Sequence, residues 1–239
     1  PLVLISPSGF RVEGLGVAKA RTDSLTLLAL AVLAGAFISL GALFFIVVVT
    51  KSALGFGMTR LVGGLSFCLG LILVVVAGAE LFTGNNLIAM AWASRLIGTR
   101  AVMRNWFLAY LGNVGGCLAT VLLVVWANAA GLGGGAVGEM ALSIARTKAD
   151  LSVIEAFTRG VLCNALVCLA VWLAMGGRSV TDKILAILFP ITAFVAMGFE
   201  HSIANWFFLP FGLALDEEGT VSIVGIASNL VAVTAGNVV

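Results

Sequence analysis

Long apolar stretches separated by short polar ones run along almost the whole chain. A helix needs about 20 mostly apolar residues to cross the hydrocarbon core of a bilayer. The stretches that reach or approach this length are Leu25–Val49, Leu61–Ala79, Trp106–Ala130, Leu151–Met175 and Ile184–Met197. The pattern therefore predicts an all-α polytopic membrane protein that crosses the lipid bilayer several times.

Two of these stretches are interrupted by polar residues and then continue. The second is followed by Glu80–Asn86 and continues at Leu87–Trp92. The fifth is followed by Glu200–Ser202 and continues at Ile203–Leu215. Interrupted apolar segments at matching points of two halves indicate the binding site of a transporter.

A repeated motif supports this division into halves. The frame G-x-E-x-x-x-x-N occurs at Gly78–Asn85 and at Gly198–Asn205, and the frame N-x6-G-N-V follows at Asn105–Val114 and at Asn229–Val238. Three spans per half, an odd number, make the halves antiparallel. We predict six transmembrane helices in an inverted 3+3 repeat, with the second and fifth helices broken. Because the last frame should open a sixth span and the sequence stops at Val239, we expect that helix to be truncated here.

The pattern divides the chain into four parts. Residues 1–23 form an N-terminal segment, for which we expect a short helix on the membrane surface. Residues 24–130 form the first repeat, residues 131–150 a periplasmic connection, and residues 151–239 the second repeat. Lys and Arg are more frequent in the loops on the side of the N-terminus, and the positive-inside rule therefore places both termini in the cytoplasm.

Composition excludes several functional classes. The chain is 61% hydrophobic and 10% charged, with a mean hydropathy of +1.17, whereas soluble domains carry roughly 25% charged residues. The net charge is only +2, and no basic cluster is interleaved with aromatic residues, so we expect no nucleic-acid partner. The four cysteines lie in apolar stretches without metal-binding spacing, so we expect no metal and no cofactor.

Few polar side chains lie at membrane depth, where they are costly and therefore functional candidates. They are Glu80, Thr83, Asn85, Asn86, Asn164, Glu200, His201, Ser202 and Asn205. Most lie in the two interruptions. A half-helix that begins at an interruption directs its N–H groups, which carry partial positive charge, toward the midplane. Two antiparallel half-helices would attract a small anion.

His201 is the only histidine in the chain. A lone histidine is more often structural, but this one lies at a broken helix, and no other side chain titrates near neutral pH. Superposition of the repeats predicts that it lies opposite Thr83. We expect it to give a hydrogen bond or a proton to a permeating anion.

The remaining candidates have a structural interpretation. We expect Glu80 and Glu200 to bind backbone N–H groups freed by the helix breaks, because polar groups in lipid need partners. Ser202 and a set of asparagines should hold the breaks in the same way: Asn85, Asn105, Asn113, Asn205, Asn229 and Asn237. The apolar residues near the breaks either pack helix on helix or form rings that dehydrate a pore: Phe67, Leu71, Phe82 and Phe194.

These motifs resemble those of the formate/nitrite transporter family. The match lies in Glu80–Asn85 and Gly198–Asn205, with Asn105-Trp106 and Gly112-Asn113 between them, and it extends from about Thr22 to the end of the chain. The resemblance implies an aquaporin-like protomer with one pore, a homopentamer, and a place in the bacterial inner membrane.

The resemblance also implies roles for single residues. His201 corresponds to the central pore histidine, Thr83 to the threonine that faces it, and Asn164 to an asparagine near that pair. Lys148 corresponds to a basic residue of the outer vestibule. The constriction positions correspond to Leu71, Phe67, Leu81, Phe82, Val167 and Phe194.

Formate is the favoured substrate, because Thr83–Leu87 and Ala91–Ser94 resemble formate-type members, and nitrite is second. Hydrosulfide or another weak-acid anion is the alternative within the family. A neutral-solute channel is disfavoured because paired Asn-Pro-Ala boxes are absent. A membrane subunit of a redox enzyme is disfavoured because one histidine cannot supply bis-histidine haem ligation. We expect proton-coupled flux, and blunted coupling in His201→Asn.

Overall fold

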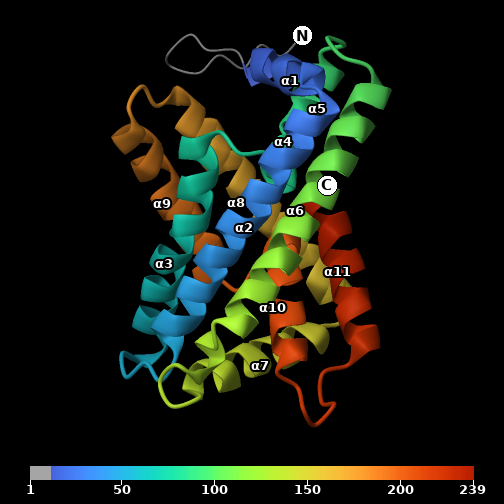
Figure 1. Ribbon diagram of the computed structural model, residues 1–239. Helices are drawn as coiled ribbons and strands as arrows, with labels where there is room; N and C mark the ends of the chain where they lie inside the picture. Colours follow the sequence, from blue (N-terminus) through green and yellow to red (C-terminus); the bar gives the residue numbers. More distant parts are fainter. Residues whose placement is uncertain (1–11) are drawn as a thin grey trace.

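The computed structural model describes residues 12–239, and every regular element in that range is a helix (Figure 1). The helices are α1 (Val12–Arg21), α2 (Ser24–Val49), α3 (Gly55–Ala77), α4 (Phe82–Asn85), α5 (Ile88–Ala93), α6 (Thr99–Trp126), the 3-10 turn η1 (Ala129–Gly131), α7 (Ala136–Ala149), α8 (Val153–Gly176), α9 (Val180–Ala196), α10 (Ser202–Ala214) and α11 (Ile223–Val238).

Four of these helices, α2, α3, α6 and α8, are long and apolar enough to cross a membrane. Helices α10 and α11 are shorter and also apolar. Large apolar side chains such as Leu25, Phe107 and Phe189 are exposed on the outer faces of the bundle. An apolar exterior of this extent needs lipid or a partner subunit to cover it.

Both predicted helix breaks are present. Helix α3 ends before Gly78 and α9 ends before Gly198, and these glycines have φ angles of 72° and 74°. The left-handed conformation suits glycine because it has no Cβ. The chain then runs extended until α4 begins at Phe82 and α10 begins at Ser202.

Equivalent hydrogen bonds confirm the inverted repeat. The Asn113 side chain donates to the Ala31 carbonyl (2.7 Å) and accepts from the Phe82 backbone N–H (2.8 Å). In the second half, the Asn237 side chain donates to the Gly160 carbonyl (2.8 Å) and accepts from the N–H of Ser202. As predicted, these two asparagines hold the backbone freed by the breaks.

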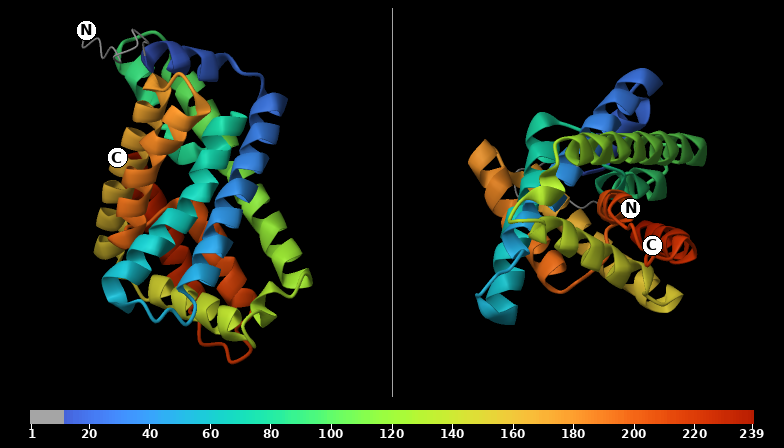
Figure 2. Two further views of the ribbon diagram at one scale, coloured as in Figure 1. Left: turned by 90° about the vertical axis from the view of Figure 1, so that its left-hand side faces the viewer. Right: turned by 60° about the horizontal axis from the view of Figure 1, so that its bottom comes forward.

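The repeat includes two helices that lie across opposite ends of the bundle, α1 and α7 (Figures 1 and 2). A short helix in the N-terminal segment was predicted, but α7 was not, since residues 136–149 were assigned to the connection. Ala141, Ala145 and Ala149 form its buried face. The backbone of Gly212 in α10 approaches Ala145 so closely that a Cβ would not fit. The four-residue spacing of these alanines is a helical signal that the weak hydropathy of the segment obscured.

Three helix starts differ from the apolar boundaries, and the first is that of α3, which begins at Gly55 rather than Leu61. Helix α9 begins at Val180 rather than Ile184 because Ser179 and Asp182 form a capping box. Helix α6 begins at Thr99 rather than Trp106, so its first turns are polar. A search for apolar stretches does not detect polar helical turns that extend beyond the apolar span.

Candidate functional site

The two broken helices meet at a hydrogen bond between Thr83 and His201. The Thr83 Oγ1 and His201 Nε2 atoms are 3.0 Å apart, and both side chains are buried. Thr83 lies in α4, directly after the first break. His201 is the N-cap of α10, and its Nδ1 accepts a hydrogen bond from the Ala204 backbone N–H (3.1 Å).

This geometry fixes the tautomer of the imidazole. Nδ1 accepts the Ala204 N–H, so it carries no proton, and the proton of the neutral ring is on Nε2. Nε2–H therefore donates to the Thr83 hydroxyl, which keeps its own hydrogen for another acceptor. Protonation of Nδ1 would place its N–H opposite the Ala204 N–H and replace a hydrogen bond with a repulsive contact. The site therefore favours a neutral imidazole.

The contact joins side chains that are not equivalent in the repeat. At the 120-residue offset of the two motifs, His201 corresponds to Leu81 and Thr83 corresponds to Ile203. The side chains of Thr83 and His201 do face each other, although superposition of the motifs alone does not pair them. The two repeats therefore contribute different residue types to this contact, a threonine from the first and a histidine from the second.

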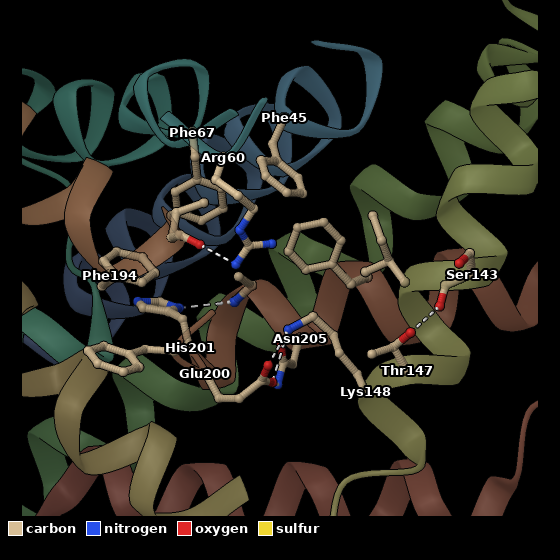
Figure 3. A pocket seen from close by; sticks show the side chains of 15 residues that line it. Phe45, Arg60, Phe67, Ser143, Thr147, Lys148, Phe194, Glu200, His201 and Asn205 are labelled. Carbon is tan, nitrogen blue, oxygen red and sulfur yellow. Dashed lines mark hydrogen bonds and ion pairs between the residues drawn. The ribbon is translucent and has the colours of Figure 1, made fainter. Parts of the chain in front are cut away.

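A cavity of about 250 Å³ opens beside His201 toward α7, and we call it the α7 pocket (Figure 3). At its wall, Lys148 Nζ donates to both carboxylate oxygens of Glu200, at 2.8 and 2.9 Å. The Asn205 side chain donates to the same carboxylate (2.7 Å). The pocket is lined by Phe45, Arg60, Phe67, Ser143, Ile144, Thr147, Lys148, Phe194, Val195, Phe199, Glu200, His201, Ala204, Asn205 and Phe208.

A second cavity, of about 490 Å³, lies toward α1, and we call it the α1 pocket. Lys19 Nζ donates to Glu80 Oε2 there (2.7 Å). The α1 pocket is lined by Leu15, Ala18, Lys19, Thr22, Leu71, Val74, Val75, Gly78, Ala79, Glu80, Leu81, Gly84, Asn85, Val171, Ala174, Met175, Gly177 and Lys183.

The partners of the two glutamates differ from the prediction. Their carboxylates bind Lys19 and Lys148 rather than backbone N–H groups. Among residues 12–239, the contacts of these two residues with the backbone of other residues come from their main chains: the Glu80 N–H donates to the Leu30 carbonyl and the Glu200 N–H to the Arg159 carbonyl, each at 3.2 Å. A cation is the better partner because a buried carboxylate needs charge compensation.

Asparagine pairs extend both ion pairs. Asn85 donates to Asn105 (3.0 Å), and Asn105 donates to the carbonyl of Lys19 (3.2 Å). Asn205 donates to Asn229 (2.8 Å), which in turn donates to the carbonyl of Lys148 (2.9 Å). Each network ties a half-helix to the surface helix at its own end of the bundle.

Four of the six constriction candidates line the two pockets. The Phe67 and Phe194 rings meet edge to face at 5.7 Å in the α7 pocket, and Phe194 stacks on His201 at 6.0 Å. Leu71 and Leu81 line the α1 pocket.

Two further constriction candidates line neither pocket. Phe82 packs against Tyr110, with ring centroids 5.0 Å apart, and Val167 is buried in the core.

Asn164 makes no hydrogen bond to Thr83 or His201. Its Nδ2 contacts Cys168 Sγ (3.6 Å), and that sulfur lies 3.8 Å from the Thr83 carbonyl oxygen. Its Oδ1 is buried without a partner among residues 12–239. The Ser202 hydroxyl is likewise unpaired there, so Ser202 contributes through its backbone N–H.

The sequence model of the family described as "Formate/nitrite transporter" matches residues 10–239. The chain belongs to this family. "Formate channel FocA" of Escherichia coli (strain K12) is 39% identical over 259 residues, which cover 100% of this chain and 91% of that protein. "Probable formate transporter" of Methanothermobacter thermautotrophicus is 39% identical and covers 88% of this chain and 82% of its own.

Solved structures agree with this assignment. The structure titled "Pentameric formate channel with formate bound" has a TM-score of 0.81 at 34% identity, covering 90% of this chain and 91% of its own. "FNT family ion channel" has a TM-score of 0.85 at 30% identity, covering 95% of this chain and 91% of its own. The resemblance and the fold class predicted from the sequence are confirmed, and the family is one of channels and transporters rather than enzymes.

A charged residue of the α7 pocket in this member of the formate/nitrite transporter family was not among the predicted candidates. This residue, Arg60, lies in the first turns of α3 and lines the α7 pocket. Its Nε donates to the Ala196 carbonyl (2.9 Å) and its Nη2 to the Val195 carbonyl (2.8 Å). The signal was its seven-residue spacing from Phe67, which places both residues on one helix face.

Proposed function

We propose that the protein is a transmembrane channel or transporter for small monovalent anions, with formate as its substrate and nitrite as the second candidate. Relatives that cover most of the chain are named formate channels or transporters. A structural neighbour at 34% identity is described with formate bound. Neither nitrite nor hydrosulfide is named in these relatives, so formate ranks first.

The observation that carries the proposal is the neutral donor pair Thr83–His201 at the meeting point of the two broken helices. The α7 pocket lies on one side of it and the α1 pocket on the other. Phe67 and Phe194 line the α7 pocket beside the Thr83–His201 pair, and Leu71 and Leu81 line the α1 pocket on the other side of that pair. An ion that leaves a pocket loses water between these groups. The Thr83 hydroxyl, whose hydrogen is left free by the bond from His201, replaces part of that hydration.

The apolar flanks favour a neutral permeant. Transfer of an isolated carboxylate into an apolar passage costs far more than transfer of the neutral acid. The acid fraction of a weak acid rises about tenfold for each unit that the pH falls. Flux should therefore rise at low pH, and protons accompany the anion.

The role of His201 that we propose is that of hydrogen-bond donor. To supply a proton, the ring must first become an imidazolium, which breaks the Nδ1 bond to Ala204. The acid therefore forms in the pocket, before it reaches the histidine. This differs from the expectation that coupling is blunted in His201→Asn, and the reason is the hydrogen bond at Nδ1.

We propose further that the protein is a homopentamer in the bacterial inner membrane, with both termini in the cytoplasm. The pentameric neighbour supports the assembly, with a TM-score of 0.81. The bacterial relatives and the distribution of Lys and Arg support the location and orientation.

Flux assays in proteoliposomes test the proposal. Formate, nitrite, hydrosulfide, glycerol and water are compared at pH 5 and pH 7, with empty liposomes as control. Formate flux that exceeds the control and rises at pH 5 is the expected result. Free passage of glycerol or water without anion flux would replace the proposal with a neutral-solute channel.

A further inference from the structure

We infer that Arg60, rather than Lys148, is the residue that concentrates anions in the α7 pocket. This inference rests on the proposed transport of anions and assigns its capture step to one side chain. Arg60 enters the pocket from α3, while Lys148 enters it from α7 (Figure 3). Both are cations, so the question is which charge a solute anion encounters.

The charge of Lys148 is already matched. Its ammonium group contacts both carboxylate oxygens of Glu200 within 2.9 Å, in a pair that is largely shielded from water. Asn205 holds the same carboxylate. A cation and an anion this close act on a third ion mainly as a dipole, so the pair adds little net attraction.

The charge of Arg60 is not matched by a carboxylate. Among residues 12–239, no acidic side chain lies within 4.0 Å of its guanidinium, and its partners there are the Val195 and Ala196 carbonyls. The guanidinium has more N–H groups than these two bonds use. The side chain is half-buried, so the remaining donors can reach an anion in the pocket.

The carbonyl partners of Arg60 also affect the electrostatic potential of the pocket. Val195 and Ala196 end the half-helix α9, whose last carbonyls carry a partial negative charge and lie beside the pocket. Arg60 covers that end and compensates it. Without Arg60, the pocket would contain a neutralised ion pair and an uncovered negative helix end, and it would no longer attract anions.

Comparison of the two repeats shows that Arg60 has no equivalent cation in the second half. The position 120 residues after Arg60 is Val180, which carries no charge. In contrast, each of the two breaks has one lysine–glutamate ion pair. The lysine–glutamate pairs therefore belong to the architecture of the breaks. Arg60 therefore has no cation at its equivalent position in the second half, and the α1 pocket has an additional cation at a different position, Lys183.

The first test compares Arg60→Gln and Arg60→Lys with wild type in formate-loaded proteoliposome assays at low and high ionic strength. Arg60→Gln should raise the half-saturating formate concentration on the order of fivefold near 10 mM salt. The difference should shrink to less than about twofold at 0.3 M salt, because screening shortens the range of the charge. Arg60→Lys should keep the salt dependence of wild type.

Lys51→Gln is the matched control. It removes one positive charge from the loop that precedes α3, at the same end of the bundle but outside the pocket, and should change the half-saturating concentration much less than Arg60→Gln at both salt concentrations. A purely structural effect of Arg60→Gln would lower the maximal rate without changing its dependence on salt. An unchanged half-saturating concentration in Arg60→Gln at low salt would overturn the inference.

A second variant leaves Arg60 and its bonds intact. Ser143 is exposed and lines the same pocket, so Ser143→Glu adds a carboxylate without disturbing the core. If Arg60 supplies the net charge, the added carboxylate cancels it and the half-saturating concentration becomes independent of salt. If Arg60 does not contribute a net positive charge, the added carboxylate makes the pocket negative. The half-saturating concentration then falls as salt is added, which would refute the inference. Absence of formate flux in wild type would instead overturn the proposed function, and this inference with it.

Discussion

The Nε2 atom of His201 lies 3.0 Å from the hydroxyl oxygen of Thr83, and this bond links the two broken helices of opposite repeats. Because Nδ1 is occupied by the Ala204 N–H, the ring has one tautomer and one orientation. The site is thus held as a fixed neutral donor. A group that stays neutral can solvate an anion or its acid without retaining the anion by charge.

The first prediction concerns His201→Asn. An asparagine at the N-cap can accept the Ala204 N–H through Oδ1 and direct its amide N–H groups toward Thr83. We expect a folded protein that transports formate and keeps most of its dependence on pH, because the acid forms outside the histidine. Formate flux at pH 5 and pH 7 measures this. A variant that transports but no longer responds to pH would make His201 the proton donor.

His201→Leu provides the comparison. Leucine fills the space but neither caps α10 nor donates to Thr83, and loss of the cap alone costs about 1 kcal/mol. We expect a lower melting temperature and a loss of flux at both pH values. Equal flux in His201→Leu and wild type would mean that hydrogen bonding at this position does not assist transport.

The second prediction concerns the ion pair of Lys148 and Glu200. Lys148→Met leaves a carboxylate buried without its cation, and breaking such a pair costs about 3 kcal/mol or more. The double variant Lys148→Met/Glu200→Gln should recover much of that loss, because no buried charge remains. Thermal unfolding in detergent, followed as a double-mutant cycle, measures the coupling.

The equivalent pair of Lys19 and Glu80 is a natural comparison. It has one ion contact instead of two, and its side chains are 23% and 10% exposed against 15% and 6% for the other pair. Lys19→Met should therefore cost less than Lys148→Met, since water compensates the exposed carboxylate better. A larger loss of stability in Lys19→Met than in Lys148→Met would contradict this dependence on exposure to water.

The third prediction concerns Asn113. Its side chain satisfies the N–H of Phe82 and the carbonyls of Ala31 and Glu80 at the first break. Asn113→Leu leaves these backbone groups unpaired in a buried site, at about 1–3 kcal/mol for each. We expect loss of folded protein or of flux. Thr158→Ala, which removes an exposed hydroxyl bound to its own helix, should leave melting temperature and flux unchanged.

The sequence predicted the spans, both breaks and the contacts of Asn113 and Asn237 at the breaks, because apolar length and a repeated motif are local signals. It did not predict the partners of Glu80 and Glu200. Those lysines lie 61 and 52 positions away in helices with little apolar character. Arg60 was missed for the same reason, since its carbonyl partners are 135 and 136 positions distant. Contacts of this kind depend on how the helices assemble, which the pattern of apolar residues does not specify.

The last prediction uses two adjacent glycines of α6 that differ in their surroundings. A Cβ at Gly116 would collide with the Val32 carbonyl of α2, whereas a Cβ at Gly115 would meet nothing within 4 Å. Small residues at such crossings let helix backbones approach each other in membranes. Gly116→Ala should therefore force α2 and α6 apart and cost roughly 1–3 kcal/mol, while Gly115→Ala should be neutral or slightly stabilising because alanine favours helix. Helix α2 also carries the Ala31 carbonyl that Asn113 holds, so separation of the two helices should reduce flux as well as melting temperature. Equal melting temperatures for the two variants would contradict the close packing of α2 and α6.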